Sequence, residues 1–336
     1  MHCARGMKHE PAKAQTGDAA AIGLSGVAAV LPERSFGLEE LAATGRISSR
    51  PEALTEMGFD RVFLADEDES ACALAARAAE GALKDAGLKP EEIDILLWAS
   101  ALPGNHLRTS SNGHAPAVLR HFTYAASWLQ EELGLERATV TAIAQQGCAG
   151  MFSALRTARA MLLAEPEAQH VLCVGVDVLP PDESREILYN LISDAACAVV
   201  VSRNAPRDRW VAFHQVTRGY YWDTPALQKE IIAAYFPTSR IVLQELLAKA
   251  DLEPDAIDKI IPTGVNATSW PILLRLTGLA EDRLYRSNQQ FGHTIAADNF
   301  LFLQEIRRER SVPRGSRLLL FTYGFGSTWC GLILEH

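Results

Sequence analysis

The chain has 336 residues, more than one compact hydrophobic core usually needs, so its length favours two domains or one large duplicated domain. Hydrophobic residues make up 48% of it and charged residues 22%, a composition typical of a globular fold and not of a disordered, collagen-like or coiled-coil protein. The formal net charge of -9 disfavours nonspecific binding to nucleic acid or to an anionic membrane.

The cysteines and the apolar runs indicate the cellular compartment in which the protein works. Six cysteines are scattered along the chain without a CxxC pair, which favours a reducing compartment and a cytoplasmic location. The longest apolar runs, 171–178 and 195–201, are far shorter than the roughly 20 residues that a membrane span requires, so no membrane association is expected. Residues 1–20 lack the apolar core of a secretory signal and are expected to form a flexible arm.

Hydrophobic patterns predict strands and helices in turn along the chain. Strands are expected at 22–31, 95–98, 171–176, 195–201, 210–216, 260–261, 318–322 and 331–334. Helices are expected at 71–86, 152–162, 241–250 and 295–307. Strands rich in Val, Leu and Ile that alternate with helices imply an α/β protein, in which helices cover both faces of mainly parallel sheets.

An internal repeat divides the chain. Residues 86–94 (AGLKPEEID) recur at 250–258 (ADLEPDAID), at an offset close to half the chain, and each copy lies between a predicted helix and a predicted buried strand. We therefore expect two similar α/β halves, 21–205 and 206–336. The alternative is a chance match, because this pattern is also typical of an ordinary helix-to-strand loop.

Cys148 is the candidate nucleophile. It lies in the segment 145–150 (QQGCAG), just before an amphipathic helical pattern. Small neighbours let the backbone turn tightly and leave the sulfur approachable, and a helix N-terminus favours negative charge on it. The alternative is a buried cysteine that packs at the start of a helix, which is how the other five are interpreted.

The second half offers a counterpart in His293, within the turn Gly292-His293-Thr294 before another helical pattern. If the halves are related by pseudo-twofold symmetry, two helix N-termini meet at the centre, and Cys148 and His293 form a dyad. Gly326 lies in a glycine-bearing turn between the last two predicted strands. Its backbone N–H, with that of Cys148, is a candidate oxyanion hole for acyl transfer. A plain β-hairpin is the alternative for this turn.

Four motifs in order, at 148–150 (CAG), 193–200 (SDAACAVV), 292–294 (GHT) and 324–329 (GFGSTW), resemble those of the thiolase-fold condensing enzymes, most closely the β-ketoacyl-acyl carrier protein synthase III group. The resemblance implies a five-layered αβαβα fold, a homodimer and a cysteine that takes an acyl group from coenzyme A or acyl carrier protein. It also implies no tightly bound cofactor.

Two departures from this family's pattern concern its catalytic turns. Condensing members place a His in a Pro-His-x-x-Asn turn, where this chain has Thr263, and an Asn in a Gly-Asn-Thr turn, where it has His293. In those enzymes both side chains donate hydrogen bonds to the malonyl thioester oxygen during decarboxylation. If each donor is worth roughly 3 kcal/mol, losing one slows decarboxylation about a hundredfold.

A single His beside an acylated Cys suits a different task, namely deprotonating a hydroxyl, amine or thiol that then accepts the acyl group. The sequence therefore favours an acyltransferase of the kind found in natural-product pathways, acting on a small-molecule acceptor. Two alternatives stay open: a carbon–carbon bond-forming condensing enzyme, and a catalytically weak partner subunit of an active homologue.

Several further residues are weaker candidates. Asp298 follows His293 by five residues, about 140° around a helix, and is a candidate orienting group. Thr263 and Asn266 are candidates for holding the imidazole or the acyl carbonyl, or for capping a helix. Trp222 is a candidate wall of an acyl tunnel or an interface plug. Arg108 either faces a carrier protein or cofactor phosphate, or lies on the solvated surface. No metal site is expected, since the histidines at 106, 114 and 121 match no zinc spacing.

Overall fold

The computed structural model describes residues 21–66, 69–102, 118, 122–188, 190–287 and 290–336. The arm expected at 1–20 and the candidate Arg108 lie outside these residues. None of the described helices is long and apolar enough to cross a membrane.

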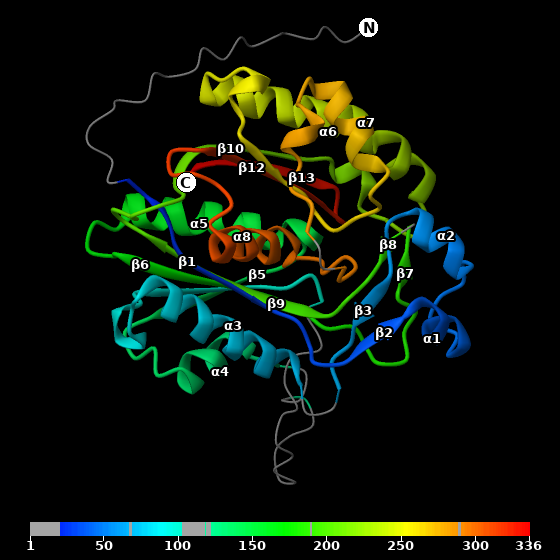
Figure 1. Cartoon of the computed structure of the whole chain (residues 1–336). Coiled ribbons are helices and arrows are strands. Elements are labelled where there is room, and N and C mark those ends of the chain that lie inside the picture. The colour runs from blue at the N-terminus through cyan, green and yellow to red at the C-terminus, as the bar shows by residue number, and fades with distance from the viewer. Residues whose placement is uncertain (1–20, 67–68, 103–117, 119–121, 189, 288–289) are drawn as a thin grey trace, which may run out of the picture.

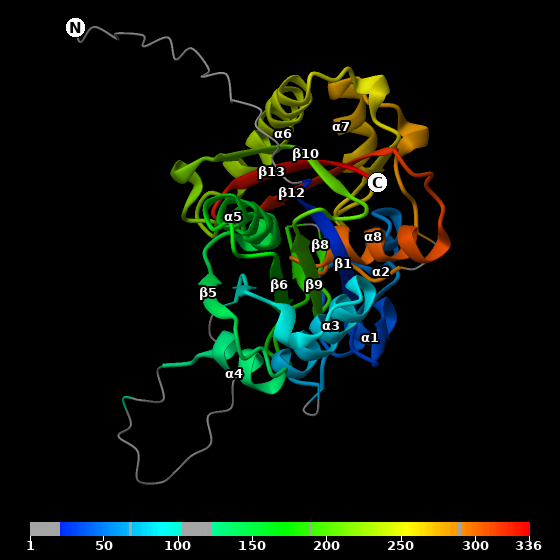
Figure 2. The same cartoon turned by 90° about the vertical axis from the view of Figure 1, so that its left-hand side faces the viewer.

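The chain folds into five layers, two sheets and three layers of helices, as the family resemblance implied (Figure 1). One outer layer contains α6 (Gln228–Ala250) and α7 (Ser269–Thr277), which cover a sheet of β10 (Arg209–Thr217), β11 (Lys259–Ile261), β12 (Arg317–Gly324) and β13 (Thr328–Glu335). The central layer contains α5 (Gly150–Ala164) and α8 (Asp298–Glu309). Beneath it lie β1 (Gly23–Val30), β4 (Ile95–Ala99), β5 (Thr139–Ile143), β6 (His170–Asp177) and β9 (Ala195–Ser202), and then α3 (Ala71–Ala86) and α4 (Ala125–Glu132). Figure 2 shows the same layers after a quarter turn.

Smaller elements lie at one side of these layers, beside the central sheets (Figure 1). They are β2 (Ser35–Gly37), β3 (Arg61–Phe63), α1 (Leu38–Ala43), α2 (Pro51–Glu56), β7 (Glu186–Ile187) and β8 (Asn190–Leu191). Strands β7 and β8 form a hairpin, and β2 pairs with β3. Short 3-10 turns occur at Pro90–Glu92, Gly147–Ala149, Gly219–Tyr221, Pro254–Ala256 and Glu281–Arg283.

The strand order is β11-β12-β13-β10-β1-β9-β6-β4-β5, and the two sheets join where β1 pairs with β10. Parallel pairing is limited to β4–β5, β4–β6 and β11–β12, and the other pairs in this order are antiparallel. The expectation of mainly parallel sheets was therefore wrong. The physical reason lies in the connections between the strands. A tight turn joins β12 to β13, and the segment from β6 to β9 contains no crossover helix. Because parallel neighbours need a crossover connection, these short connections produce antiparallel pairs.

The internal sequence repeat forms the same structural unit in both halves. Helix α3 ends at the left-handed Gly87 (φ 69°), a 3-10 turn follows at Pro90–Glu92, and β4 begins at residue 95. Helix α6 ends at the left-handed Asp251 (φ 54°), a 3-10 turn follows at Pro254–Ala256, and β11 begins at residue 259. The proposed boundary near residue 205 remains a proposal, and it falls in the connection between β9 and β10.

The repeated aspartates make matching contacts. The Asp94 N–H donates to the carbonyl oxygen of His170 (3.0 Å), and its carboxylate accepts from the His170 N–H (3.1 Å). In the second half, the Asp258 N–H donates to the carbonyl oxygen of Arg317 (3.0 Å), and its carboxylate accepts from the Arg317 N–H (2.7 Å). Each aspartate thus anchors the start of the strand that pairs in parallel with the one following it: β6, which pairs with β4, and β12, which pairs with β11.

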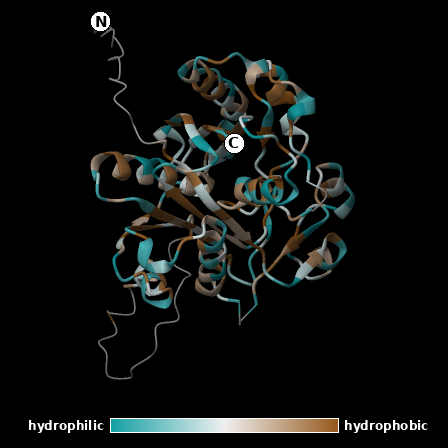
Figure 3. Ribbon diagram, turned by 60° about the vertical axis from the view of Figure 1, so that its left-hand side comes forward, coloured by the Kyte–Doolittle hydropathy of each residue, from teal (hydrophilic) through white to brown (hydrophobic). Residues whose placement is uncertain are grey.

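The main core fills the space between the two sheets. Helix α5 buries Met151, Phe152, Leu155, Ala158 and Leu162, and the ring of Phe152 lies 6.1 Å from that of Phe300 in α8. Figure 3 shows the hydrophobic residues concentrated in the strands and in the inner faces of the helices. Because β6 and β9 are covered on both faces, their apolar residues run without the alternation typical of a half-exposed strand.

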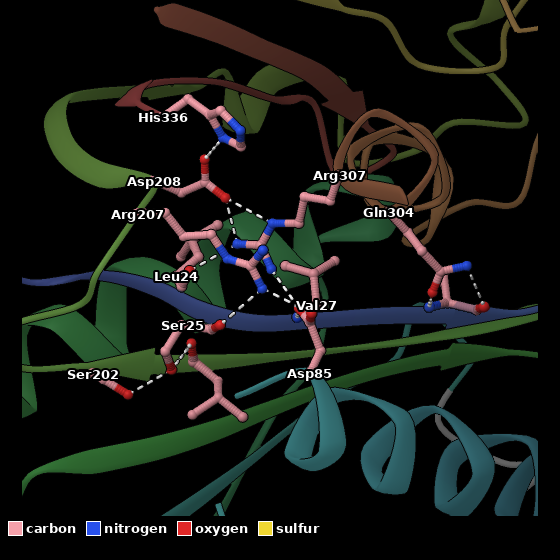
Figure 4. Close-up of polar contacts among 12 residues, drawn as sticks. Leu24, Ser25, Val27, Asp85, Ser202, Arg207, Asp208, Gln304, Arg307 and His336 are labelled. Carbon is pink, nitrogen blue, oxygen red and sulfur yellow. Dashed lines mark hydrogen bonds and ion pairs between the residues drawn. The ribbon is translucent and has the colours of Figure 1, made fainter. Parts of the chain in front are cut away.

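A polar network ties the two halves together (Figure 4). Arg307 of α8, whose side chain is 4% exposed, donates to Asp208 (2.8 Å), Asp85 (2.7 Å) and the carbonyl oxygen of Leu24 (2.7 Å). Arg307 contacts the Oδ2 of Asp208, and the Nδ1 of His336 lies 2.6 Å from its Oδ1. Burial raises the pKa of Asp208, but the charge of Arg307 and the contacts of His336 outweigh burial and hold that pKa below its ordinary value.

Candidate active site

Cys148 lies in the 3-10 turn Gly147–Ala149, which carries the chain from β5 into α5. The turn packs against the loop between β12 and β13 so closely that a Cβ at Gly147 (φ 50°) would lie 2.4 Å from the nitrogen of Phe325. A Cβ at Gly324 would lie 2.2 Å from the carbonyl oxygen of Gln146. Glycine is therefore required on both sides of this contact. Cys148 is partly exposed, whereas Cys72, Cys173, Cys197 and Cys330 are buried.

His293 approaches Cys148 from the second half, and its Nε2 lies 3.2 Å from the Cys148 Sγ. The backbone of His293 bridges to the segment after β8: its N–H donates to the carbonyl oxygen of Leu191 (2.7 Å), and its own carbonyl oxygen accepts from Ser193 (2.9 Å). The expectation that His293 sits at the mouth of a helix was wrong, because α8 begins only at Asp298. The imidazole is held by a strand-like bridge instead.

Asp298 stands directly behind the imidazole. Its Oδ2 lies 2.5 Å from the His293 Nδ1 and also accepts from the Gly264 N–H (2.7 Å), while its Oδ1 accepts from the N–H and the hydroxyl of Thr294 (both 2.7 Å). A carboxylate only accepts, so the proton lies on Nδ1 and Nε2 faces the sulfur. The expected separation of 140° does not occur, since the chain curls between 293 and 298 and no helix contains both residues.

The opposite charges of His293 and Asp298 each stabilise the ionised form of the other. Burial lowers the pKa of His293, but the Asp298 carboxylate and then the Cys148 sulfur outweigh burial and raise that pKa well above its ordinary value. Burial raises the pKa of Asp298, but His293 and the hydrogen bonds from Thr294 hold it below its ordinary value. These contacts favour the protonated imidazole, which faces the sulfur through Nε2 and can stabilise negative charge on it.

The backbone around the site is strained at three non-glycine residues. Gln145 (φ 63°), Ile295 (φ 57°) and Ser327 (φ 54°) occupy the left-handed region, which costs about 1–3 kcal/mol each. They lie within three residues of Cys148, His293 and Gly326 respectively. Such strain persists only where the surrounding contacts impose it, and here it converges on one site from three separate segments.

A cavity of about 760 Å³ opens onto these residues. Its lining contains six of the sequence candidates, namely Cys148, Trp222, Thr263, Asn266, His293 and Gly326. Apolar side chains of α6 form part of one wall: Ile231, Ile232, Tyr235 and Phe236. Trp222 is 77% exposed, so the cavity reaches the surface beside it. The lining includes residues of α6, of α7 and of the β7–β8 hairpin.

Of the weaker candidates, Thr263, Asn266 and Gly326 line the cavity, but their contacts differ. Both nitrogens of the His293 ring face other groups, Nδ1 facing Asp298 and Nε2 facing Cys148, so the ring is already held without Thr263 or Asn266. The side-chain oxygen of Asn266 accepts from the N–H (3.0 Å) and the hydroxyl (2.7 Å) of Thr268, just before α7. Asn266 therefore stabilises the turn that precedes α7, but it does not cap the helix, whose N-cap residue is Thr268 and which has no side-chain cap. Gly326 (φ 82°) lines the cavity, and its role in an oxyanion hole remains a proposal.

Sequence reasoning missed three parts of the site: the hydroxyl of Thr294, the N–H of Gly264 and the strand-like bridge at Leu191 and Ser193. The Gly264 N–H and the bridge at Leu191 and Ser193 lie far from His293 in sequence and act through the backbone, so no residue pattern marks them. Thr294 belongs to the Gly-His-Thr motif, but that motif does not indicate which group its hydroxyl contacts. The nearest available signal was the motif beginning at Ser193. Among the residues that the structure describes, no group of three or more His, Cys, Asp or Glu side chains is placed to hold a metal ion.

Comparison with known families gives two matches. The model described as 3-oxoacyl-[acyl-carrier-protein (ACP)] synthase III matches residues 144–219, and that of the C-terminal part of the same enzymes matches residues 247–336. The β-ketoacyl-[acyl-carrier-protein] synthase III of Aquifex aeolicus is 25% identical over 316 residues, covering 90% of this chain and 94% of that protein. That of Sphingopyxis alaskensis is 27% identical over 337 residues, covering 93% and 98%.

Solved structures agree on the fold. The Aquifex aeolicus synthase III superposes with a TM-score of 0.80 at 24% identity, covering 94% of this chain and all (100%) of that chain. ChlB3, described as an acyltransferase, superposes with a TM-score of 0.79 at 21% identity, covering 94% of this chain and 97% of that chain. The priming β-ketosynthase of a polyketide pathway gives 0.78 at 21% identity, covering 96% and 98%. At these identities the likeness shows the architecture.

Proposed function

Because this chain belongs to the thiolase-fold β-ketoacyl-acyl carrier protein synthase III-like enzymes, which use acyl-cysteine chemistry, we propose that it passes an acyl group from a thioester through Cys148 to a small nucleophile. The observation that carries this proposal is the hydrogen-bonded series of Cys148, His293 and Asp298, at 3.2 Å and 2.5 Å. Thr263 occupies the position where the condensing pattern places its histidine, and His293 occupies the position of its asparagine.

The first half-reaction loads the cysteine. The Cys148 thiolate attacks the carbonyl carbon of the acyl thioester, forming a carbon–sulfur bond, while the carbonyl oxygen takes up negative charge near the backbone N–H groups of Cys148 and Gly326. The intermediate collapses with cleavage of the donor carbon–sulfur bond. The leaving thiolate takes the proton from the His293 imidazolium. The products are an acyl-cysteine, a free thiol and a neutral His293.

The second half-reaction uses that neutral imidazole as a base. Asp298 keeps the remaining proton on Nδ1, so Nε2 presents a lone pair to the cavity. Nε2 removes the proton of an incoming hydroxyl, the oxygen attacks the acyl carbon, and the Cys148 thiolate leaves. The imidazolium and thiolate are restored, and the acceptor departs as an ester. An amine or thiol acceptor follows the same steps.

The same geometry disfavours decarboxylative condensation. That reaction needs donors aimed at the enolate oxygen, and a neutral His293 whose only proton is held by Asp298 offers an acceptor there. The hydroxyl of Thr263 is a weaker donor than an imidazolium. The second candidate function is nevertheless condensation, because the relatives from Aquifex and Sphingopyxis are named synthases. A catalytically weak partner subunit fits less well with a complete Cys148, His293 and Asp298 arrangement.

Similarity to the family supports a proposal for the acyl donor and for the setting in which the protein works. Its members take acyl groups from acyl carrier protein or coenzyme A and need no tightly bound cofactor. For this chain we propose a homodimer working in the cytoplasm of the producing cell, within a biosynthetic pathway that supplies a small-molecule acceptor.

One experiment separates these functions. The protein is loaded with an acyl-coenzyme A, the adduct on Cys148 is measured by intact-protein mass spectrometry, and the loaded enzyme is then offered either a panel of small alcohols and amines or malonyl-coenzyme A. Transfer to an alcohol or amine without carbon dioxide release supports acyl transfer. Carbon dioxide release with a β-keto product supports condensation instead. Cys148→Ala is the matched control, and an adduct that persists in it rejects Cys148 as the nucleophile.

A further inference from the structure

Ile295 has a backbone conformation that a β-branched residue rarely adopts. Its φ of 57° lies in the left-handed region, two residues after His293. The contacts around it impose this conformation. Thr294 donates from both its N–H and its hydroxyl to Asp298, and its carbonyl oxygen accepts from the N–H of Ala297 (3.2 Å). A glycine would satisfy this turn without strain, so the retention of isoleucine needs another reason.

The side chain of Ile295 suggests that reason. It is 9% exposed, lines the cavity and packs with Leu179 and Ile192 in a small apolar cluster, against which Cys148 also packs. We call these three side chains the apolar wall. They come from three segments, after β6, after β8 and before α8, so the apolar wall exists only in the folded chain.

From this arrangement we propose that Ile295 determines which acyl chains Cys148 can carry, by setting the space beside the sulfur. Because the apolar wall packs against Cys148 and lines the same cavity, an acyl group bonded to Sγ begins beside it. Ile295 is a stiff stop: its χ1 angle is restricted by β-branching, and its backbone is held by the turn that also holds Asp298. The inference rests on the acyl-cysteine step of the proposed function and not on the identity of the acceptor.

The test compares chain-length preference among variants. Wild type, Ile295→Ala, Ile295→Phe and Ile241→Ala are mixed with acetyl-, hexanoyl- or dodecanoyl-coenzyme A, and the initial rate of adduct formation on Cys148 is followed by mass spectrometry. Ile241 is the matched control, since it is 40% exposed on α6 and does not line the cavity. Ile295→Ala should raise the rate with dodecanoyl relative to acetyl by about tenfold, and Ile295→Phe should lower the rate with hexanoyl relative to acetyl by about tenfold.

The outcomes are distinguishable. Suppose that wild type forms adducts, but that the loading rates of both Ile295→Ala and Ile295→Phe, taken relative to acetyl, agree with those of wild type within about twofold. The role of Ile295 is then rejected while the proposed function stands. If wild type forms no adduct with any of the three thioesters, the acyl-cysteine step is overturned and the inference goes with it. Should Ile295→Ala not fold, Ile295→Val shortens the side chain by one methylene and must shift the ratios in the same direction by a smaller factor.

Discussion

The Nε2 of His293 lies 3.2 Å from the sulfur of Cys148, although 145 residues separate the two in the chain. Cys148 comes from the first half of the molecule and His293 from the second, and both line one cavity of about 760 Å³. Their separation depends on two tight backbone contacts, that of Gly147 against Phe325 and that of His293 against Leu191 and Ser193.

Replacing Asp298 with Asn should impair acyl loading strongly. The Asp298 carboxylate is the largest influence that raises the pKa of His293, so its loss lowers that pKa and destabilises the imidazolium opposite Cys148. We expect the loading rate to fall by about 10³ to 10⁴, by analogy with loss of the carboxylate in a catalytic triad. In wild type, loading should persist until the pH rises through the raised pKa of His293, and in the variant it should decline at lower pH. Mass-spectrometric loading rates across pH measure this, with the exposed Asp255→Asn as control.

Gly147→Ala should disrupt the turn that carries the nucleophile. The new Cβ would lie 2.4 Å from the nitrogen of Phe325, and φ at this position is 50°, so both a clash and backbone strain arise. Gly87→Ala isolates the strain, because φ there is 69° and a Cβ would meet nothing within 4 Å. We expect Gly87→Ala to cost about 1 kcal/mol of unfolding free energy and Gly147→Ala clearly more, together with loss of loading. Equal costs in chemical denaturation would contradict the role assigned to the clash.

Arg307→Met should destabilise the fold by about 3–5 kcal/mol, because it leaves Asp208 buried without its main partner. The pKa of Asp208 is depressed, so the stabilisation is present above its unfolded pKa of about 4 and is lost as the pH falls through the folded value. The unfolding free energy of wild type should therefore decline below about pH 4 more steeply than that of Arg307→Met. Arg286→Met is the control, since its pair with Glu281 is exposed and should matter by less than about 1 kcal/mol.

Thr263→His combined with His293→Asn should move the enzyme toward condensation. These changes restore the two donors of the condensing pattern at residues that line the cavity, and each donor is worth roughly 3 kcal/mol in the transition state. Carbon dioxide release from malonyl-coenzyme A should rise by at least about a hundredfold over wild type, the effect of a single donor, while transfer to alcohols should fall because the base at 293 is gone. A double variant that loads Cys148 normally but releases no more carbon dioxide than wild type would show that the donors alone do not decide the reaction.

The local sequence was sufficient to predict those features that depend only on neighbouring residues. The small residues around Cys148 indicate a tight turn before a helix, and the repeated Asp94 and Asp258 indicate equivalent helix-to-strand connections, which the structure shows as 3-10 turns. The relative direction of paired strands could not be predicted in this way. Whether β9 lies parallel or antiparallel to β6 depends on how the connection 178–194 returns, and hydrophobic pattern carries no information on that direction.

By itself, the sequence determined the α/β class, the duplicated halves and a cysteine whose small neighbours permit a nucleophile's turn, since these follow from periodicity and steric size along the chain. Only the tertiary structure decided that Asp298 faces the Nδ1 of His293, that the apolar wall of Leu179, Ile192 and Ile295 stands beside the sulfur, and that backbone groups at 191, 193 and 264 hold the site. Such contacts join residues far apart in the chain or act through main-chain atoms that every residue shares, so they come into being only when the halves pack together.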